Sequence, residues 1–208
     1  MEKKILITVA RQCGCGGREI AARVSEALGI PMYDKEIVEA AAAAGELHPE
    51  VAKREDERAA NSLLYTLVMG AHSHTVTHGM AMHMPINDRI FLLQSDFIRE
   101  KAEASGIFVG RCADYILREE TCRLSVFLHA PYDARVRRVM AENPALSHNE
   151  ASDTVTKTDR RRSSYYSFYT GGKWGKHEHY HLSLDTDRFG IDGAAALIVA
   201  AASRLLAD

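Results

Sequence analysis

The sequence predicts an α/β fold in which a mainly parallel sheet is flanked by helices. Residues 4–10 form a continuous apolar and β-branched run, which is typical of a strand buried on both faces. Three further runs of this kind occur at 107–109, 124–128 and 180–184, and segments with helical periodicity separate them. Strands that alternate with helices favour a parallel sheet, because parallel neighbours need a crossover connection.

Length and composition indicate a single domain that spans residues 1–208. Hydrophobic residues make up 46% of the chain and charged residues 26%, which is ordinary for a soluble globular protein. The longest apolar stretch, 194–202, is far shorter than the roughly 20 residues of a membrane-spanning helix, so we expect no membrane partner. The four cysteines form no paired CxxC motifs, which favours a reduced, cytoplasmic protein. A net charge of −2 does not indicate a nucleic-acid binder.

Helical periodicity and flanking cap residues predict the helices. Gly29 and Gly45 end the first two helices, and Asp34 and Asn87 are predicted N-caps. The spacing of Ser147–Glu150 is that of a capping box. The predicted helices cover, in order, residues 18–28, 35–44, 88–101, 133–141, 148–165 and 191–206, with a short extended link at 31–33 and a loop at 171–175.

Residues 46–87 give a weaker signal. The stretch 61–70 looks helical, whereas 72–85 carries four His and three Met without a clean period. His74 and His78 are four residues apart, as metal ligands on a helix are, but no cysteine or acidic residue in the stretch completes a set. We therefore interpret 72–84 as a flexible, substrate-facing or interface segment, and a homo-oligomer stays open.

The most specific feature is the glycine-rich segment between the first strand and the first helix. Glycines let the backbone bend until successive N–H groups point at one anion, and a helix N-terminus adds partial positive charge. We therefore predict that this loop binds nucleotide phosphates. A tight turn that needs glycine for its conformation alone is the alternative. The predicted phosphate-binding residues are Gln12, Cys13, Gly14, Cys15, Gly16, Gly17, Arg18 and Glu19.

The loop lacks the lysine of the Walker pattern GxxxxGK[ST]. Arg18 is the only nearby cation that can replace it, so we expect Arg18 to contact the phosphates. Glu19 stands where the nucleoside monophosphate kinase variant of the loop has a hydroxyl, and its carboxylate is a candidate ligand for Mg²⁺. Cys13 and Cys15 lie at a helix N-terminus, where a thiol pKa can fall, but small loop fillers are the simpler interpretation.

Nearly the whole chain resembles the cytidylate kinase-like family, the relatives of bacterial cytidylate kinase. The likeness rests on ARQCGCGGREIA, LGIPMYDKEIV, GIFVGRCADYIL, SVFLHAP, DRRRSSYY and YHLSLDTDRFGID, at residues 10–21, 28–38, 106–117, 125–131, 159–166 and 180–192. It implies a P-loop NTPase fold with a helical monophosphate-binding insertion at 46–104 and a lid at 145–178. It also implies ATP and Mg²⁺ as cofactors, small nucleotides as substrates, and a loop that in this family commonly lacks the Walker lysine.

The resemblance implies an acceptor-binding group at the second buried strand. Arg111 is similar to the Arg of the family's GRD motif, which helps to hold the acceptor's phosphate; an Arg in a surface ion pair is the alternative. Cys112 replaces the Asp of that motif, and Asp114 is the candidate substitute. Asp34, inside the matching segment 28–38, is a further candidate for acceptor binding.

The resemblance also implies roles for the lid and the last strand. Asp159 and Arg162 are similar to the D-x-x-R pair of the lid, which touches the acceptor, and Arg161 is a second candidate on the same helix. Arg18, Arg162 and Arg161 are therefore the predicted catalytic residues. Asp185 and Thr186 are similar to the segment near the donor adenine.

The functional hypothesis is ATP-dependent phosphoryl transfer to a nucleoside monophosphate such as CMP or dCMP. A nucleotide-binding regulatory module with little or no turnover is one alternative, because the loop lacks its lysine. A kinase of a non-nucleotide small molecule is another. Residues 135–176 carry nine Lys and Arg against four Asp and Glu, so the predicted lid is basic, which suits a small polyanionic ligand.

Overall fold

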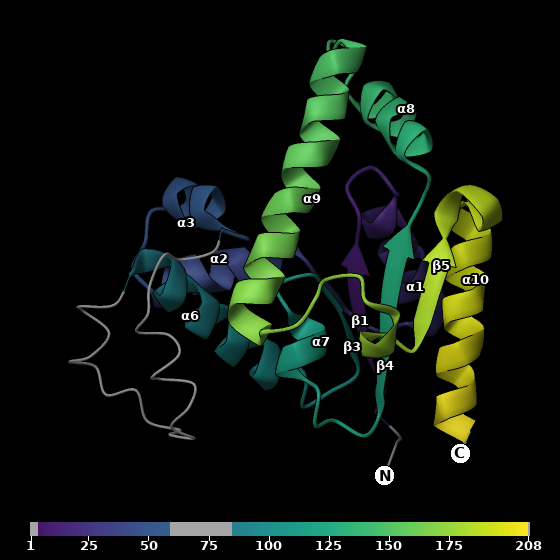
Figure 1. Cartoon of the computed structure of the whole chain (residues 1–208). Coiled ribbons are helices and arrows are strands. Elements are labelled where there is room, and N and C mark those ends of the chain that lie inside the picture. The colour runs from purple at the N-terminus through teal and green to yellow at the C-terminus, as the bar shows by residue number, and fades with distance from the viewer. Residues whose placement is uncertain (1–3, 59–84, 208) are drawn as a thin grey trace.

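Five parallel strands form the centre of the molecule, in the order β2-β3-β1-β4-β5 (Figure 1). The computed structural model describes residues 4–58 and 85–207. Val9 on the central strand pairs with Val109 on one side and Val126 on the other, so these three strands end at one edge of the sheet. The strands are β1 Leu6–Arg11, β2 Met32–Tyr33, β3 Gly106–Val109, β4 Arg123–His129 and β5 Leu182–Asp185.

The predicted parallel α/β sheet is confirmed, with two differences at its edges. The segment predicted as an extended link is β2, which pairs with β3 through Met32 and Tyr33. The last strand begins at Leu182, two residues later than predicted, because a short 3₁₀ helix, His177–His179, precedes it.

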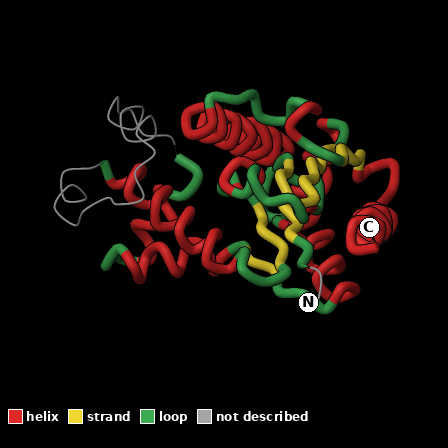
Figure 2. The backbone as a smooth tube through the Cα atoms, turned by 90° about the horizontal axis from the view of Figure 1, so that it is seen from below, coloured by secondary structure: helices red, strands yellow, loops and turns green. Residues whose placement is uncertain are grey.

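Helices cover both faces of the sheet, and the sheet lies between them in the view of Figure 2. One core packs alternate strand residues such as Ile7 and Val9 against α1 and α10. The other packs Leu6 and Phe108 against α6, α7 and α9. The helices are α1 Gly17–Leu28, α2 Lys35–Ala44, α3 Pro49–Glu55, α6 Ile86–Lys101, α7 Ala113–Ile116, α8 Tyr132–Glu142, α9 His148–Thr170 and α10 Thr186–Ala207.

Several helix ends differ from the prediction. Helix α6 begins at Ile86, so Asn87 is not its cap; the Asn87 amide instead donates to Glu55 at 3.3 Å. Asp34 occupies the N-cap position of α2, but its side chain does not cap the helix. The capping box of Ser147 and Glu150 is present, and α9 continues to Thr170.

Two short helices, α3 and α7, were not predicted, and the predicted helix at 61–70 and the 72–84 segment lie outside the described residues.

Helix α10 begins five residues earlier than predicted and bends at Gly190, where φ is 66°. It is the one helix of the described ranges that passes a test for a membrane span by length and hydropathy alone. Its residues Ala194, Ile198 and Ala202 are buried in the core that α1 shares, so this is weak evidence for a span.

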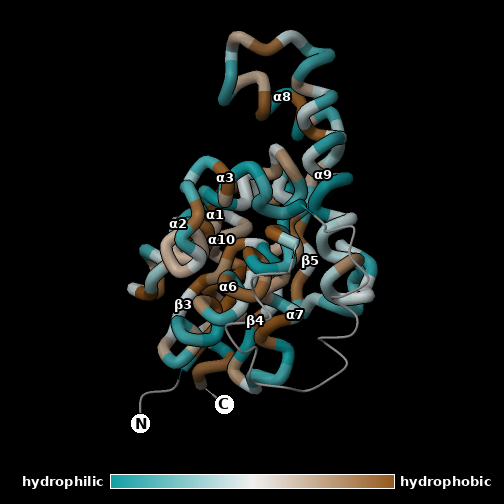
Figure 3. The backbone as a smooth tube through the Cα atoms, turned by 90° about the vertical axis from the view of Figure 1, so that its left-hand side faces the viewer, coloured by the Kyte–Doolittle hydropathy of each residue, from teal (hydrophilic) through white to brown (hydrophobic). Residues whose placement is uncertain are grey.

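Helix α8 and the adjoining end of α9 project from the body of the molecule (Figure 3). They pack against one another through Val136, Val139, Ala151 and Val155, a small core separate from the two that flank the sheet. The remainder of α9 returns across the sheet edge where β1 and β3 end. This helix therefore brings its charged residues to the same edge as the glycine-rich loop.

Candidate functional site

The glycine-rich loop connects β1 to α1 at the carboxyl end of the central strand. Gly14 and Gly16 have φ values of +75° and +74°, a region that side-chain-bearing residues adopt only with strain. A Cβ atom on Gly14 would lie 2.5 Å from the carbonyl oxygen of Arg135, and one on Gly16 would collide with Ile191. The loop thus needs glycine both for its dihedral angles and for the close approach of α8 and α10.

Three consecutive backbone N–H groups of this loop have no hydrogen-bond partner among residues 4–58 and 85–207: those of Gly14, Cys15 and Gly16. The flanking N–H groups are satisfied, since Gln12 donates to the carbonyl of Leu128 at 2.9 Å and Cys13 donates to Asp159 at 2.7 Å. Cys15 is buried, and a buried N–H without a partner is unfavourable. Such a row of donors at a helix N-terminus fits a phosphate group.

The two loop cysteines are not activated thiols. Burial raises the pKa of the Cys15 thiol to about 11, and burial likewise raises that of Cys13. Both positions are therefore small, protonated loop fillers, as the simpler interpretation of the sequence held.

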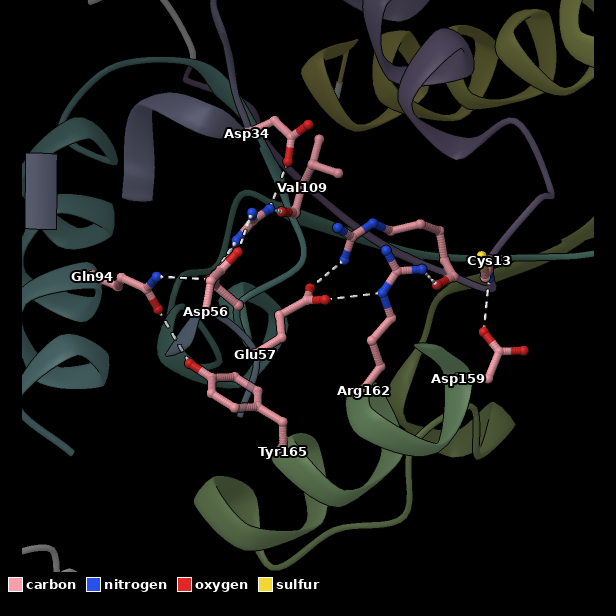
Figure 4. Close-up of polar contacts among 11 residues, drawn as sticks. Cys13, Asp34, Asp56, Glu57, Gln94, Val109, Asp159, Arg162 and Tyr165 are labelled. Carbon is pink, nitrogen blue, oxygen red and sulfur yellow. Dashed lines mark hydrogen bonds and ion pairs between the residues drawn. The ribbon is translucent and has the colours of Figure 1, made fainter. Parts of the chain in front are cut away.

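A buried cluster of charges lies beside the loop (Figure 4). At its centre, Glu57 accepts hydrogen bonds from Arg11 at 2.8 Å and from Arg162 at 3.0 Å. These three side chains are between 6% and 16% exposed, so solvent screens the pairs little. Burial opposes ionisation of Glu57, but Arg11, Arg162 and Arg111 together hold its pKa well below the usual range.

The second part of this charged cluster is built around Arg111. Its guanidinium pairs with Asp34 at 2.6 Å and with Asp56 at 2.8 Å, and it folds back to donate to the carbonyl of Val109 at 2.8 Å. Gln94 donates to Asp56 at 3.0 Å and so fixes that carboxylate from α6. Burial disfavours the charged form of Arg111, but Asp56, Glu57 and Asp34 raise its pKa and keep it protonated.

The turn that presents Arg111 is conformationally unusual. Gly110, Arg111 and Cys112 all have positive φ, at 79°, 50° and 56°. Two of the three are not glycine, and such residues persist in this conformation only where the surroundings impose it. The ion pairs of Arg111 and the burial of Cys112 supply that constraint.

One carboxylate joins the residue after the loop to the charged cluster, and a second joins the loop to α8. Asp34 pairs with Arg111 and also with Arg18, at 3.3 Å. Asp159 accepts from the N–H of Cys13 and pairs with Arg135 at 2.6 Å. Five residues expected at the site from the sequence are therefore gathered around the loop: Arg18, Asp34, Arg111, Asp159 and Arg162.

Other residues expected at the site lie further away. Both carboxylate oxygens of Glu19 are engaged by arginines, Arg138 at 2.6 Å and Arg23 at 3.5 Å. Asp114 is buried and accepts from the Tyr166 hydroxyl at 2.8 Å, and burial raises its pKa.

The residues expected near the adenine lie at the end of β5. Asp185 accepts from the N–H of Asp187 at 3.0 Å, and Thr186 donates to the carbonyl of His129 at 3.3 Å. The Gln12 side chain accepts from the N–H of Ala130, next to His129, so Asp185 and Thr186 lie near the start of the loop.

Sequence analysis missed four charged residues of the site. Arg11 ends β1, and Arg135 lies on α8, where it donates to the carbonyl of Cys13 at 3.1 Å. Asp56 and Glu57 follow α3 in the segment that gave the weakest signal. Their neighbours alternate in charge (Arg54, Glu55, Arg58), a pattern that is typical of a solvated surface and gave no indication of burial.

The charged cluster is closed in this state. The cavity between Arg11, Arg111 and Arg162 has a volume of about 20 Å³, room for about one water molecule. A phosphate group that binds any of these arginines must therefore displace a carboxylate.

Comparison with known proteins places this site in context. The model of the cytidylate kinase-like family matches residues 6–188. An uncharacterized protein from Eubacterium ventriosum ATCC 27560 is 26% identical, with a TM-score of 0.69 over 97% of this chain and 99% of that one. Shikimate kinase from Bacteroides thetaiotaomicron is 14% identical, with a TM-score of 0.54 over 93% and 96%. A search of the curated proteins gives no match. The P-loop kinase fold predicted from the sequence is thus confirmed.

Replacement of Gly14 by alanine tests the geometry of the loop. Gly29→Ala, also at positive φ but with no atom within 4 Å of the added Cβ, should cost only about 1–2 kcal/mol of unfolding free energy. Gly14→Ala adds the collision with Arg135, so we expect a further loss of about 1–3 kcal/mol in urea unfolding. Equal losses in the two variants would contradict the close approach of α8.

Replacement of Glu57 by glutamine tests the buried ion pairs. It leaves Arg11 and Arg162 without a counter-charge, so we expect a loss of about 3–5 kcal/mol of unfolding free energy. The control Glu119→Gln, whose side chain is 88% exposed, should change it by no more than about 0.5 kcal/mol.

The pH dependence of stability provides a second test of Glu57. Because its folded-state pKa is lowered, its contribution is present above the unfolded value of about 4.3 and is lost as the pH falls through the folded pKa. Urea unfolding at a series of pH values should therefore show a smaller acid-induced loss of stability in Glu57→Gln than in the wild type. Parallel pH profiles would mean that Glu57 does not carry the lowered pKa.

Proposed function

Because the chain belongs to the cytidylate kinase-like family, we propose that it is an ATP-dependent kinase that transfers the γ-phosphoryl group to a small acceptor. A nucleoside monophosphate such as CMP or dCMP is the first candidate acceptor. The observation that carries the proposal is the row of three unpaired N–H groups at Gly14, Cys15 and Gly16, between a buried strand and a helix N-terminus. That arrangement supports binding of a polyphosphate chain.

The donor side of the proposed site is the loop from Gln12 to Glu19. Its N–H groups would hold the ATP phosphates, and Arg18 would supply the positive charge that a Walker lysine gives elsewhere. The Arg18 side chain is 57% exposed and has one ion pair, to Asp34, so it can turn toward a phosphate at low cost. Magnesium keeps several waters and binds mainly to the phosphates; Glu19 is the candidate protein ligand and would have to release Arg138.

The acceptor side would use Arg111 and Arg162, with Asp34, Asp114 and Asp159 around them. Phosphoryl transfer needs positioning and neutralisation of charge more than covalent chemistry, and arginines supply both. Helix α9 carries Asp159 and Arg162 and contacts the loop directly, so its displacement would couple acceptor binding to the loop.

A non-nucleotide acceptor is the second candidate, and one observation favours it. Arg11, Arg111 and Arg162 already have carboxylate partners, so the cluster does not require an acceptor phosphate for its charge balance. Asp34, between Arg18 and Arg111, could orient an acceptor hydroxyl instead. The same kinase fold occurs in enzymes with many different acceptors, so the acceptor must be identified by measuring turnover on each candidate.

A coupled assay of ADP release tests the proposal. The enzyme at high concentration is given ATP, Mg²⁺ and each of the nucleoside monophosphates in turn, and then small hydroxyl-bearing acids and phosphorylated sugars. Turnover with CMP or dCMP above that with the other acceptors supports the first candidate. ATP binding in calorimetry without turnover on any acceptor would instead support the regulatory binding module.

Arg18→Ala should separate turnover from folding. We expect kcat to fall by about 10²–10³-fold, because a charge that stabilises the transition state is lost. Since Arg18 is largely exposed, the unfolding free energy of the variant should differ from that of the wild type by no more than about 0.5 kcal/mol. The matched control is Arg23→Ala, an exposed arginine on the same helix that pairs with Glu19 and Asp192; its kcat should stay within about twofold of the wild type. Equal effects of the two substitutions would remove Arg18 from the proposed machinery.

A further inference from the structure

Cys13, the residue before the first glycine of the loop, is held by α8 and α9. Its N–H donates to Asp159 on α9 at 2.7 Å (Figure 4), and its carbonyl accepts from Arg135 on α8 at 3.1 Å. Its thiol hydrogen-bonds Thr158, and its side chain packs against the small core that α8 and α9 share. Gln12, one residue earlier, is instead bonded to β4 and to the residue that follows this strand's end. The hold on the chain therefore passes from the sheet to the two helices within one residue.

One pair of side chains makes both backbone contacts of Cys13. Asp159 uses one carboxylate oxygen for the Cys13 N–H and the other for Arg135, at 2.6 Å. The guanidinium of Arg135 also donates to the carbonyls of Cys13 and Ala130, at 3.1 Å and 3.0 Å. Arg135 is only 6% exposed, and these contacts are all to the protein itself. It is therefore placed to hold the loop and not to contact a ligand.

The carbonyl of Cys13 sets the direction of the Gly14 N–H, the first of the three loop N–H groups that have no partner in the described ranges. The two groups belong to one planar trans peptide unit, in which C=O and N–H point in opposite directions. Because Arg135 fixes the carbonyl toward α8, the N–H of Gly14 points away from α8. The close approach of Gly14 to the carbonyl oxygen of Arg135 leaves the loop little room to turn this peptide over.

We propose that Arg135 and Asp159 are positioning residues of the donor site, which orient the loop for phosphate before ATP binds. The positions of α8 and α9 then determine the affinity for ATP, because a loop that is already ordered loses less conformational freedom on binding. This inference rests on the proposed function for ATP as the ligand, whereas the holding of the loop rests on the contacts of Cys13 alone. It gives Asp159 a role on the donor side, where the family resemblance implies a contact with the acceptor.

Calorimetric titration with ATP and Mg²⁺ tests the pair in Arg135→Lys. Lysine keeps the positive charge beside Asp159 but replaces by one nitrogen the two that reach Asp159 and the carbonyls of Cys13 and Ala130. We expect the Kd for ATP to rise by about tenfold or more, the effect of one misdirected hydrogen bond to a charged group.

The matched control is Arg137→Lys, the same change at an exposed position on α8, and its Kd should stay within about twofold of the wild type. An unchanged Kd in folded Arg135→Lys, or equal changes in the two variants, overturns the proposal.

Amide hydrogen exchange in the wild type tests the same inference without a substitution. In the free protein the Cys13 N–H, bonded to Asp159, should exchange at least about tenfold more slowly than the Gly14 N–H, after correction for intrinsic rates. Addition of ATP and Mg²⁺ should then slow exchange at Gly14. Equal protection of the two amides in the free protein, or bound ATP that leaves the Gly14 rate unchanged, contradicts a loop that is oriented in advance.

The kinase assay separates failure of this inference from failure of the proposed function. If both hold, Arg135→Lys raises the KM for ATP by about tenfold and leaves the acceptor KM unchanged, a split that general loss of structure would not give. Turnover with an unchanged KM for ATP overturns the role of the pair and leaves the kinase intact. ATP binding that depends on Arg135 without turnover on any acceptor supports the pair and overturns the kinase.

Discussion

The placement of Glu57 between Arg11 and Arg162 is the interaction on which the arrangement of the site depends. Three segments that are far apart in sequence meet at this carboxylate: the end of β1, the residues after α3, and the middle of α9. A buried charge that loses its partner costs several kcal/mol. Movement of α3 would take Glu57 away from Arg162, and movement of α9 would take Arg162 away from Glu57, so each movement would leave a buried charge without its partner. These ion pairs hold the residues after α3 and the middle of α9 against the end of β1.

Two further carboxylates hold the glycine-rich loop in place beside the charged cluster. Asp34 joins Arg18 to Arg111, and Asp159 joins the N–H of Cys13 to Arg135. Asp34 therefore links the residue after the loop to the charged cluster, whereas Asp159 links the loop to α8. The proposed phosphoryl transfer would need donor and acceptor to be neutralised together, and Asp34 contacts one residue proposed for each, Arg18 and Arg111.

The parts of the site that could be predicted from the sequence are those that depend on local pattern. The run at 4–10, the glycines that follow it and the helix after them identify the loop, because strand, turn and helix signals all lie within a few residues. Arg111 was found for the same reason, since it directly follows a buried strand. Asp56 and Glu57 could not be found this way, because their partners lie 55, 46 and 105 residues away and their own neighbourhood reads as a solvated surface.

The sequence by itself determined the parallel α/β fold, the position of the glycine-rich loop and the likeness to the cytidylate kinase-like family. These follow from apolar periodicity and from the conformations that only glycine adopts, both of which are local properties. Only the tertiary structure decided which carboxylate neutralises which arginine, and that the cavity between Arg11, Arg111 and Arg162 is nearly filled. Charge pairing is decided by distance in space, because Coulomb energy falls with separation whatever the number of residues between the partners.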